Sequence, residues 1–448
     1  KSFNRFLYQR RSAVPRLFGS SGIRGIVPGE ITIDMALELG ASIGSCYDKI
    51  AVGRDVRTTG DMLRAALSCG ILACGGDVYD AGILPTPTLA LATRDYDCGV
   101  MLTASHNPPE YNGFKFWNKD TSPFDDNQMA KIEKLLYNRE FRFTDWKNVG
   151  KVHLLDRAIE SHITRVAKLV GSIDCKVVLD CGCGASSLIG PRLLRELGCK
   201  VVTINANPDG SFPGRLPEPT EDQLSLLKAT VVREEAVVGI AHDGDGDRVV
   251  VVDEMGKYID GDKMLGLLGS MLGEKGVVTT IDSSMIIDEM IGGKIIRTRV
   301  GDTYVSSAMK REGLEFGGEP SGTYIYSENS LCPDGIYFAA FIAKIAAETK
   351  LSHAISEIPD FPRKRISFNF DRSKRGEIQR RLDDQMAIIE CDELISLDGY
   401  RVQYEDGWFL IRLSGTEPKL RITAEARTPD GLDRIMDIST AIVKRCIT

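Results

Sequence analysis

The sequence predicts an α/β protein of several domains, in which mixed, mostly parallel sheets carry polar loops at their carboxyl edges. Three observations support this prediction. The chain of 448 residues is too long for one hydrophobic core. Short apolar segments alternate with helical segments along most of its length. An apolar strand that runs directly into a polar loop occurs three times, at widely separated positions.

Composition excludes several classes of protein. Hydrophobic residues make up 43% and charged residues 27% of the chain, as in soluble globular proteins. A formal net charge of −7 argues against nucleic acid or an anionic membrane as the main partner. No apolar run approaches the ~18 residues of a membrane span. The 11 cysteines favour reduced thiols over a disulfide framework. We therefore expect a cytoplasmic protein whose main partner is neither nucleic acid nor a membrane, and we leave its oligomeric state open between monomer and homodimer.

The first elements follow from capping and periodicity. We expect a helix from Thr32, its N-cap, to about residue 47. A strand at 50–53 and a helix at about 61–75 follow. We expect Ile33, Ala36, Leu37 and Gly40 to lie on one face of this helix.

The three strand-to-loop junctions indicate repeated units. Open α/β sheets bind ligands at the carboxyl ends of their strands, so three such loops can face one site. We interpret them as three related α/β units. The strands and their loops are 99–102 with 103–107, 237–241 with 242–248, and 314–316 with 317–322.

Changes in composition suggest four domains. We place them at residues 1–150, 151–255, 256–364 and 365–448. The last differs from the others, because a strand at 366–370, a hairpin at 399–413 and a helix from about Asp430 predict a smaller α+β domain.

Ser105 lies in the first polar loop, where Asn107, Pro108 and Pro109 prevent helix and sheet. A hydroxyl at the end of a strand is well placed to be a nucleophile or a phosphate carrier. The G-x-S-x-G nucleophile elbow is absent, and the loop alone also fits an ordinary turn.

Asp243, Asp245 and Asp247 alternate with glycines in the second loop. Three converging carboxylates suit a hard divalent cation, and the pattern lacks the distal glutamate of an EF-hand. A solvated acidic loop is the alternative. Repulsion between the carboxylates favours a cation, and the small number of ligands favours Mg²⁺ in a site that handles phosphate.

Other segments offer groups for anions and sugars. Arg24 lies in a glycine-rich loop, and the segment 412–421 supplies hydroxyls, backbone N–H groups and guanidinium groups for a phosphate. The third loop places Glu319 and Ser321 where they can bind sugar hydroxyls, although a turn has the same composition. The loop at 299–302 gives a weaker signal of the same kind.

Four motifs together resemble the α-D-phosphohexomutase family, which contains phosphoglucomutases, phosphomannomutases and phosphoglucosamine mutases. They are Thr103-Ala-Ser-His-Asn-Pro108 with Tyr111-Asn-Gly-Phe-Lys115, Asp243-Gly-Asp-Gly-Asp-Arg248, Gly317-Gly-Glu-Pro-Ser-Gly322, and Arg412-Leu-Ser-Gly-Thr-Glu-Pro418. They occur in the family's order and span nearly the whole chain. The resemblance implies four domains around a central cleft, the first three of related α/β topology.

The resemblance also implies roles for individual residues. Ser105 would be phosphorylated and would bind Mg²⁺ together with Asp243, Asp245 and Asp247. Arg24, Lys115 and Arg248 would surround the reacting phosphate, with Lys115 as a candidate general acid or base. Glu319 and Ser321 would bind sugar hydroxyls. The loop for the non-reacting phosphate would contain Arg412, Ser414, Gly415, Thr416 and Arg421.

The implied reaction interconverts hexose 1-phosphate and hexose 6-phosphate through a phosphoserine and a hexose 1,6-bisphosphate, which also serves as activator. Thr323 stands where many members have a histidine, so a proton-transfer role for that histidine does not carry over. The Glu319-Pro-Ser-Gly-Thr323 form is similar to archaeal members assigned to phosphoglucosamine. We therefore expect conversion of glucosamine 6-phosphate to glucosamine 1-phosphate. The alternatives are a phosphomannomutase or phosphoglucomutase, a phosphatase, and a non-catalytic sugar-phosphate-binding protein.

Overall fold

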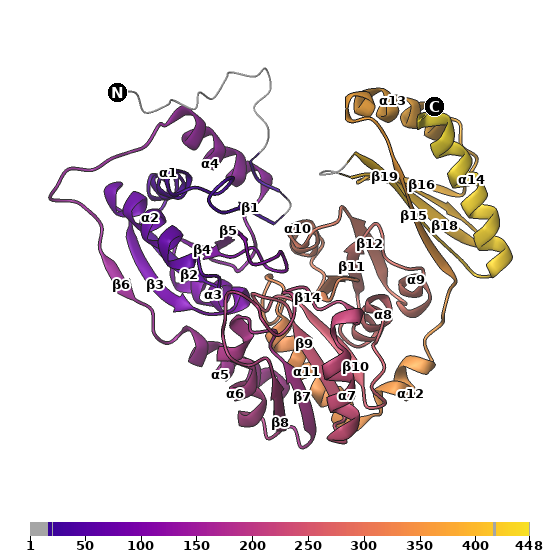
Figure 1. The fold of residues 1–448 in the computed structure, drawn as a ribbon, viewed down its shortest axis with the longest axis horizontal. Coiled ribbons are helices and arrows are strands. Elements are labelled where there is room, and N and C mark those ends of the chain that lie inside the picture. The colour runs from indigo at the N-terminus through magenta and orange to yellow at the C-terminus, as the bar shows by residue number, and fades with distance from the viewer. Residues whose placement is uncertain (1–16, 20, 415–417, 448) are drawn as a thin grey trace.

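Four sheets follow one another along the chain (Figure 1). The structure is a computed structural model that describes residues 17–19, 21–414 and 418–447. The first three sheets are mixed and carry helices, and the fourth is antiparallel. The predicted fold class is therefore confirmed. Among the described helices, none has both the length and the apolar character that crossing a bilayer requires.

The first sheet has the order β1-β5-β4-β2-β3-β6. Its strands are β1 (Ile23–Ile26), β2 (Lys49–Arg54), β3 (Asp77–Ile83), β4 (Cys98–Leu102), β5 (Tyr111–Asn118) and β6 (Val152–Leu154). Its helices are α1 (Ile33–Gly44), α2 (Gly60–Ala73), α3 (Thr86–Ala92) and α4 (Asp126–Asn138). Only β1 and β5 run antiparallel to their neighbours. β6 extends this sheet past residue 150, where we place the first domain boundary.

Helix α1 begins as predicted, because the side chain of Thr32 accepts a hydrogen bond from the N–H of Met35 at 3.1 Å. The face that carries Ile33, Ala36, Leu37 and Gly40 is only partly buried. Ile33 and Leu37 are 52% and 41% exposed. The reason is the close approach of α1 and α2, where a Cβ on Gly40 would lie 2.0 Å from the carbonyl oxygen of Leu67. This contact places the side of α1 that carries Gly40 against α2, and it leaves Ile33 and Leu37 exposed.

The second sheet has the order β10-β9-β7-β8, and the third has the order β12-β11-β13-β14. The second contains β7 (Lys176–Asp180), β8 (Lys200–Ile204), β9 (Val238–His242) and β10 (Val249–Asp253), with α5 (Ala158–Val170), α6 (Gly190–Glu196) and α7 (Ser225–Arg233). The third contains β11 (Gly276–Thr280), β12 (Lys294–Thr298), β13 (Phe316–Glu319) and β14 (Thr323–Tyr326), with α8 (Gly261–Leu272), α9 (Ile286–Met290) and α10 (Asp302–Glu312).

The first three sheets share one connectivity, which confirms the predicted repeat. The equivalent sets of four strands are β2 to β5, β7 to β10 and β11 to β14. In each set the first strand lies between the second and the third, and the fourth strand pairs antiparallel with the third. The connection from the third to the fourth strand holds the polar loop every time. These connections run from β4 to β5, from β9 to β10 and from β13 to β14. Glu319 differs from expectation, because it ends strand β13 instead of lying in the loop.

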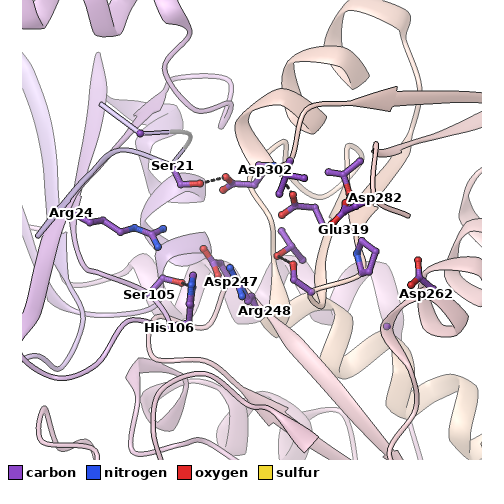
Figure 2. A pocket seen from close by; sticks show the side chains of 18 of the residues that line it. Ser21, Arg24, Ser105, His106, Asp247, Arg248, Asp262, Asp282, Asp302 and Glu319 are labelled. Atoms are coloured by element: carbon purple, nitrogen blue, oxygen red, sulfur yellow. Dashed lines mark hydrogen bonds between the residues drawn. The ribbon is translucent and has the colours of Figure 1, made fainter. Parts of the chain in front are cut away.

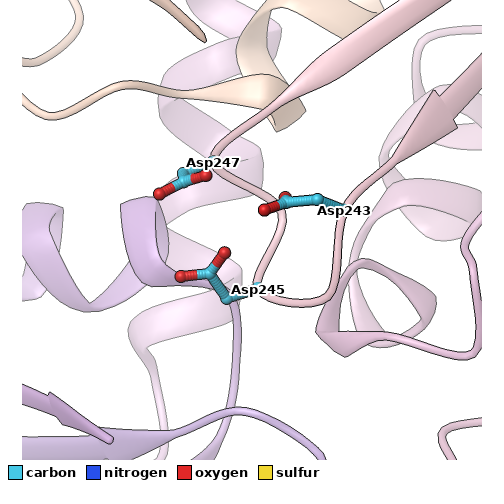
Figure 3. Close-up of side chains that lie close together, drawn as sticks. All are labelled: Asp243, Asp245 and Asp247. Atoms are coloured by element: carbon cyan, nitrogen blue, oxygen red, sulfur yellow. The ribbon is translucent and has the colours of Figure 1, made fainter. Parts of the chain in front are cut away.

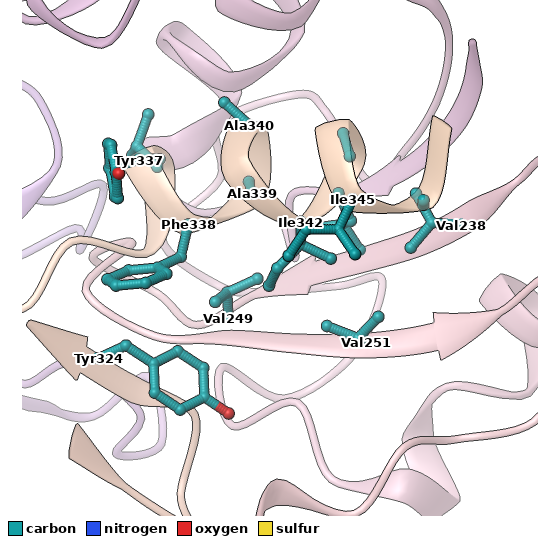
Figure 4. Packing of buried hydrophobic residues seen from close by; sticks show 14 of the residues in the cluster. Val238, Val249, Val251, Tyr324, Tyr337, Phe338, Ala339, Ala340, Ile342 and Ile345 are labelled. Atoms are coloured by element: carbon teal, nitrogen blue, oxygen red, sulfur yellow. The ribbon is translucent and has the colours of Figure 1, made fainter. Parts of the chain in front are cut away.

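Helix α11 (Gly335–Glu348) follows the third sheet in sequence but packs on the second. Figure 4 shows it across β9 and β10, with Phe338 and Ile342 facing Val249 and Val251. It is buried nearly all round, as a helix without a polar face must be. The second and third domains consequently share one hydrophobic core. The short helix α12 (Leu351–Ser356) follows.

A buried histidine joins the first three domains. The Nδ1 atom of His162 on α5 lies 2.9 Å from the hydroxyl of Thr88 on α3. Its Nε2 atom lies 2.9 Å from a carboxylate oxygen of Asp334, the N-cap of α11. Both side chains are at most 2% exposed. Because lost buried hydrogen bonds are costly, these contacts fix the three domains relative to one another.

The C-terminal domain is an antiparallel sheet in the order β15-β19-β18-β17-β16. It contains β15 (Arg363–Asn369), β16 (Glu393–Ser396), β17 (Tyr400–Tyr404), β18 (Gly407–Leu413) and β19 (Lys419–Ala426), with α13 (Arg375–Ala387) and α14 (Pro429–Ile447). It contacts the third domain through buried Arg401, which donates 2.8 Å hydrogen bonds to the carbonyl oxygens of Ile281 and Ser283.

Candidate active site

One cavity of about 900 Å³ receives the polar loops of all three repeated units. Ser105 and Arg24 line it from the first domain, and Arg248 from the second. The third domain contributes Glu319 and Asp302, on the opposite side of the view in Figure 2. Arg363 and Arg365, at the start of β15, complete the lining. The topology brings these loops together because each leaves its sheet at an equivalent connection.

Ser105 is fixed at the Asp243 end of this cavity. It is 1% exposed, and its φ of 50° is a left-handed conformation that is uncommon for serine. Its N–H donates to the hydroxyl of Thr103 at 2.8 Å. Its own hydroxyl donates to a carboxylate oxygen of Asp243 at 2.7 Å. The hydroxyl is thus oriented toward the second domain and away from its own sheet.

Arg57 holds the serine loop in place, and the sequence analysis missed it. Its buried guanidinium donates to the carbonyl oxygens of Ser105 at 2.8 Å, Asn107 at 2.6 Å and Pro108 at 2.6 Å. It also reaches the carbonyl of Tyr111 at 2.8 Å and pairs with Asp55 at 3.1 Å. The only signal in the sequence is a charged residue shortly after a strand. That signal does not distinguish a buried arginine from an exposed one.

The three aspartates form one buried group (Figure 3). One carboxylate oxygen from each lies within 4.8 Å of the others. Lys115, on β5, donates to Asp245 at 2.9 Å and to Asp247 at 2.5 Å. Lys115 therefore lies beside the aspartates, and it is not among the described residues that line the large cavity.

Burial and mutual repulsion disturb the ionisation of this group. Burial, Asp247 and Asp245 raise the pKa of Asp243. Burial and Asp245 also raise the pKa of Asp247. Burial opposes ionisation of Asp245 too, but Lys115 outweighs it and lowers the pKa of Asp245. Burial disfavours charge on Lys115, yet Asp245 and Asp247 raise its pKa. Lys115 and the nearby Arg248 supply two positive charges to three carboxylates, so the group suits further positive charge.

The aspartates fit a divalent metal ion. The Oδ1 atoms of Asp245 and Asp247 are buried and accept no hydrogen bond from any described residue. A buried carboxylate oxygen without a donor is costly, and a hard cation with oxygen ligands removes that cost. The three aspartates that the sequence singled out are therefore brought together in a group that could hold a metal ion.

Arginines surround the Ser105 end of the cavity. Arg24 donates to the side chain of Asn107 at 3.3 Å, and Arg248 lies 3.6 Å from Glu218. His106 lies near both arginines. Its burial and the positive charges of Arg248 and Arg24 lower its pKa to about 2. The imidazole is therefore neutral, and its Nδ1 atom lies 3.4 Å from the hydroxyl of Ser105. This end of the cavity suits a group with several negative charges.

The third loop supplies a carboxylic acid and hydroxyls to the cavity. Burial and Asp302 raise the pKa of Glu319 to about 8. Its Oε1 atom accepts a hydrogen bond from the N–H of Gly301 at 2.6 Å. The hydroxyl of Ser321 lies 3.1 Å from that of Thr323, the residue that replaces the common histidine. A partly protonated carboxylic acid beside hydroxyls can donate to or accept from a sugar.

The residues predicted to bind the second phosphate lie elsewhere. Arg412 and Arg421 are directly opposite each other on β18 and β19. Arg412 pairs with Asp398 at 2.7 Å, and Arg421 is exposed. Ser414 is buried at the end of β18, and Gly415 and Thr416 lie outside the described residues. Arg412, Ser414 and Arg421 do not line the large cavity.

The comparisons identify the family. Models of the phosphoglucomutase/phosphomannomutase family match its α/β/α domain I at residues 15–143, domain II at 157–256, domain III at 260–361 and C-terminal domain at 377–440. A protein of Methanosarcina barkeri named as a probable phosphoglucosamine mutase is 46% identical over 96% of this chain and 100% of its own. One of Methanosarcina acetivorans with the same name is 47% identical over the same shares.

Solved structures agree with this assignment. A phosphoglucomutase/phosphomannomutase family protein from Burkholderia thailandensis has a TM-score of 0.84 at 28% identity, over 96% of this chain and 97% of its own. A putative phosphomannomutase from Thermus thermophilus has a TM-score of 0.78 at 26% identity, over 97% of this chain and 100% of its own. The chain therefore belongs to the phosphoglucomutase/phosphomannomutase family, the phosphohexomutases that its four motifs predicted, and is an intramolecular phosphotransferase.

Proposed function

We propose that this enzyme interconverts glucosamine 6-phosphate and glucosamine 1-phosphate through a phosphorylated Ser105 and a bisphosphate intermediate. The observation that carries the proposal is the 2.7 Å contact between the Ser105 hydroxyl and Asp243 at one end of a cavity that Glu319 and Ser321 also line. A phosphate carrier, a cation site and groups for sugar hydroxyls thus open onto one space. The relatives named as probable phosphoglucosamine mutases favour an amino sugar as substrate.

Two transfers complete the reaction. In the first, a sugar hydroxyl oxygen bonds to the phosphorus of phosphoserine 105, the bond from phosphorus to the serine oxygen breaks, and the hydroxyl proton leaves. The resulting hexose 1,6-bisphosphate reverses in the cavity. In the second transfer, the Ser105 oxygen takes the other phosphoryl group and the sugar oxygen regains a proton. Phosphoryl transfer depends chiefly on positioning and neutralisation of charge, which Arg24 and Arg248 provide at this end.

Lys115 and the aspartates have connected roles in this proposal. Asp243, Asp245 and Asp247 would hold Mg²⁺ together with the phosphorylated Ser105. When bound, Mg²⁺ supplies positive charge beside the transferring group. Lys115 remains the candidate general acid or base, although it contacts Asp245 and Asp247 in this state. Lys115 contacts the Oδ2 atoms, so the Oδ1 atoms of Asp245 and Asp247 would remain available to hold the cation.

The C-terminal domain would bind the phosphate that does not react. Arg412 and Arg421 lie directly opposite on neighbouring strands, so their guanidinium groups can bind one phosphate together. We assign Arg412, Ser414, Gly415, Thr416 and Arg421 to this phosphate. Because they do not line the cavity, binding requires the C-terminal domain to approach it. We also place the enzyme in the cytoplasm, since all 11 of its cysteines are free thiols.

Phosphorylation of Ser105 can be tested directly. The purified enzyme, incubated with Mg²⁺ and glucose 1,6-bisphosphate, should gain the mass of one phosphoryl group, and peptide mapping should place it on Ser105. Ser105→Ala should gain none and lose turnover while keeping its melting temperature. Ser211→Ala, which removes an exposed hydroxyl from the second domain, should behave as wild type. Full activity in Ser105→Ala would refute the assignment.

The same preparation distinguishes the alternatives. With glucosamine 6-phosphate and a catalytic amount of the bisphosphate, a mutase forms glucosamine 1-phosphate without net release of inorganic phosphate. A phosphatase releases inorganic phosphate, and a non-catalytic binding protein gives neither product. Faster turnover of mannose or glucose phosphate would reassign the substrate and leave the mechanism intact.

A further inference from the structure

Carboxylates are concentrated on the third-domain side of the cavity, although Arg363 and Arg365 also line the cavity and Asp247 lies at the Ser105 end. Arg24 and Arg248 lie at the Ser105 end, whereas the third-domain side is rich in carboxylates (Figure 2). These acidic residues are Asp260, Asp262, Asp282, Asp302 and Glu319. A phosphorylated sugar alone would not favour such a wall, because its phosphates are negative and its hydroxyl groups are neutral.

Among the described residues, Asp262 is the only one of these five carboxylates that forms an ion pair, and Asp282 and Asp302 are two of the four that do not. Asp262 forms an ion pair with Arg363 at 2.6 Å, which accounts for its charge. In contrast, Asp282 accepts a 2.6 Å hydrogen bond from the hydroxyl of Thr280, and Asp302 accepts one from the hydroxyl of Ser21. Within the described residues, neither Asp282 nor Asp302 has a lysine, arginine or histidine nitrogen within ion-pair distance.

Asp302 is a buried carboxylate beside a second one, Glu319. Asp302 is 7% exposed, as is Glu319, and Figure 2 shows the two side chains near each other. The negative charge of Asp302 also helps to raise the pKa of Glu319 to about 8, after burial. A buried carboxylate without a cation is costly. This side of the cavity therefore suits a ligand that brings positive charge.

Asp302 and Asp282 lie on different segments near Glu319. Asp302, the first residue of α10, bonds to Ser21 of the first domain and helps to raise the pKa of Lys115, which burial alone would lower. Asp282 follows β11 and lies on the other side of Glu319 in Figure 2. The two carboxylates thus flank the residue that we assign to the sugar hydroxyls.

The positions of Asp302 and Asp282 on either side of Glu319 match a substrate that must bind in two orientations. When the sugar turns so that its other phosphate meets Ser105, its 2-substituent moves to a different part of the cavity. A single group could bind that substituent in only one orientation. Resting on the proposed function, we infer that Asp302 and Asp282 bind the 2-ammonium group of the substrate, one in each orientation, and so select 2-amino-2-deoxyhexose phosphates over their 2-hydroxyl counterparts.

Substrate preference tests this inference. We would measure kcat/KM for glucosamine 6-phosphate and for glucose 6-phosphate, with catalytic bisphosphate, in wild type, Asp302→Asn, Asp282→Asn and the double variant. Asparagine keeps the size and the accepted hydrogen bond but removes the charge. Glu274→Gln is the matched control, because it removes one exposed negative charge from the same domain.

The expected result is a loss of preference. The ratio of the two kcat/KM values should fall ~10-fold or more in each single variant, the loss expected of a charge-assisted hydrogen bond, and further in the double variant. It should stay unchanged in Glu274→Gln. In wild type the ratio should also decline above about pH 8, where an amino group loses its proton, and the double variant should lack that decline.

Two outcomes would overturn the inference. One is a ratio that stays within twofold of wild type in both single variants. The other is an equal fall for both sugars, which would indicate a general effect on the fold or on catalysis. Failure of the proposed function is separate, because wild type would then not convert glucosamine 6-phosphate at all.

Discussion

The two regions that we assign to phosphate differ in how completely they are assembled. At the Ser105 end, a buried hydroxyl, three buried aspartates and Lys115 contact one another across two domains. In the C-terminal domain, Arg412 and Arg421 face each other across a strand pair, and neither lines the cavity. The site that we assign to phosphoryl transfer is therefore preassembled, whereas the distal grip, the C-terminal residues that we assign to the other phosphate, does not line the cavity. Transfer needs near-fixed distances, whereas the distal grip must accept either phosphate of the sugar.

This comparison predicts that the largest losses come from the aspartates. Asp245→Asn, or removal of metal by a chelator, should lower kcat by ~10³-fold or more, because charge stabilisation of the transferring group is the main source of catalysis. Added Mg²⁺ should restore the chelated wild type. Asp222→Asn, an exposed change in the same domain, should retain both metal and activity. Metal content by mass spectrometry and steady-state rates check this, and full activity without metal would contradict it.

Loosening the serine loop should have the next largest effect. Arg57→Lys cannot keep all five contacts of the guanidinium, so Ser105 should shift and kcat should fall ~10²-fold with little change in KM. Arg54→Lys is the matched control. Arg54 is the last residue of β2, the strand that precedes Arg57, and it pairs with the largely exposed Asp61. Single-turnover transfer from the bisphosphate measures the step directly. A wild-type rate in Arg57→Lys would show that the contacts of Arg57 are not needed to position Ser105.

The distal grip should respond more mildly and in a different parameter. Arg421→Ala should raise KM ~10-fold and leave kcat within about twofold, because a phosphate contact retained throughout the reaction stabilises ground state and transition state alike. Arg380→Ala, an exposed arginine on α13 of the same domain, should change neither. A fall in kcat at unchanged KM would mean that the two phosphate-handling regions are equally preorganised.

The smallest effect concerns stability and pH. The pKa of Glu319 is raised from 4.5 to about 8 by burial and by Asp302, so the folded state holds its proton more tightly than the unfolded state. That contribution is complete below about pH 4.5 and is lost as the pH rises through about 8. From pH 6 to pH 9, the melting temperature of wild type should fall a few degrees more than that of Glu319→Gln. Calorimetry without substrate checks this, with Glu274→Gln following wild type; parallel curves for wild type and Glu319→Gln would refute it.

The sequence was informative where local rules apply. The apolar strands, the N-cap Thr32, the fold class and the three polar loops follow from periodicity, capping and turn chemistry, which act over a few residues. The alternation of Asp243, Asp245 and Asp247 with glycine likewise predicted a group that the structure brings together. Ser105 and these aspartates are 138 or more residues apart, and only the order of the motifs suggested that they meet.

Other features depended on packing between distant segments. Helix α11 covers the second sheet although it follows the third, and the exposed Leu37 of α1 results from the close contact of Gly40 with α2. No local sequence pattern marked Arg57 or Asp302 as a residue that is buried beside the site. By itself the sequence determined which residues could do phosphoryl chemistry, because composition and spacing fix local geometry. Only the tertiary structure decided which of them share a buried cavity, because burial and charge balance depend on residues hundreds of positions away.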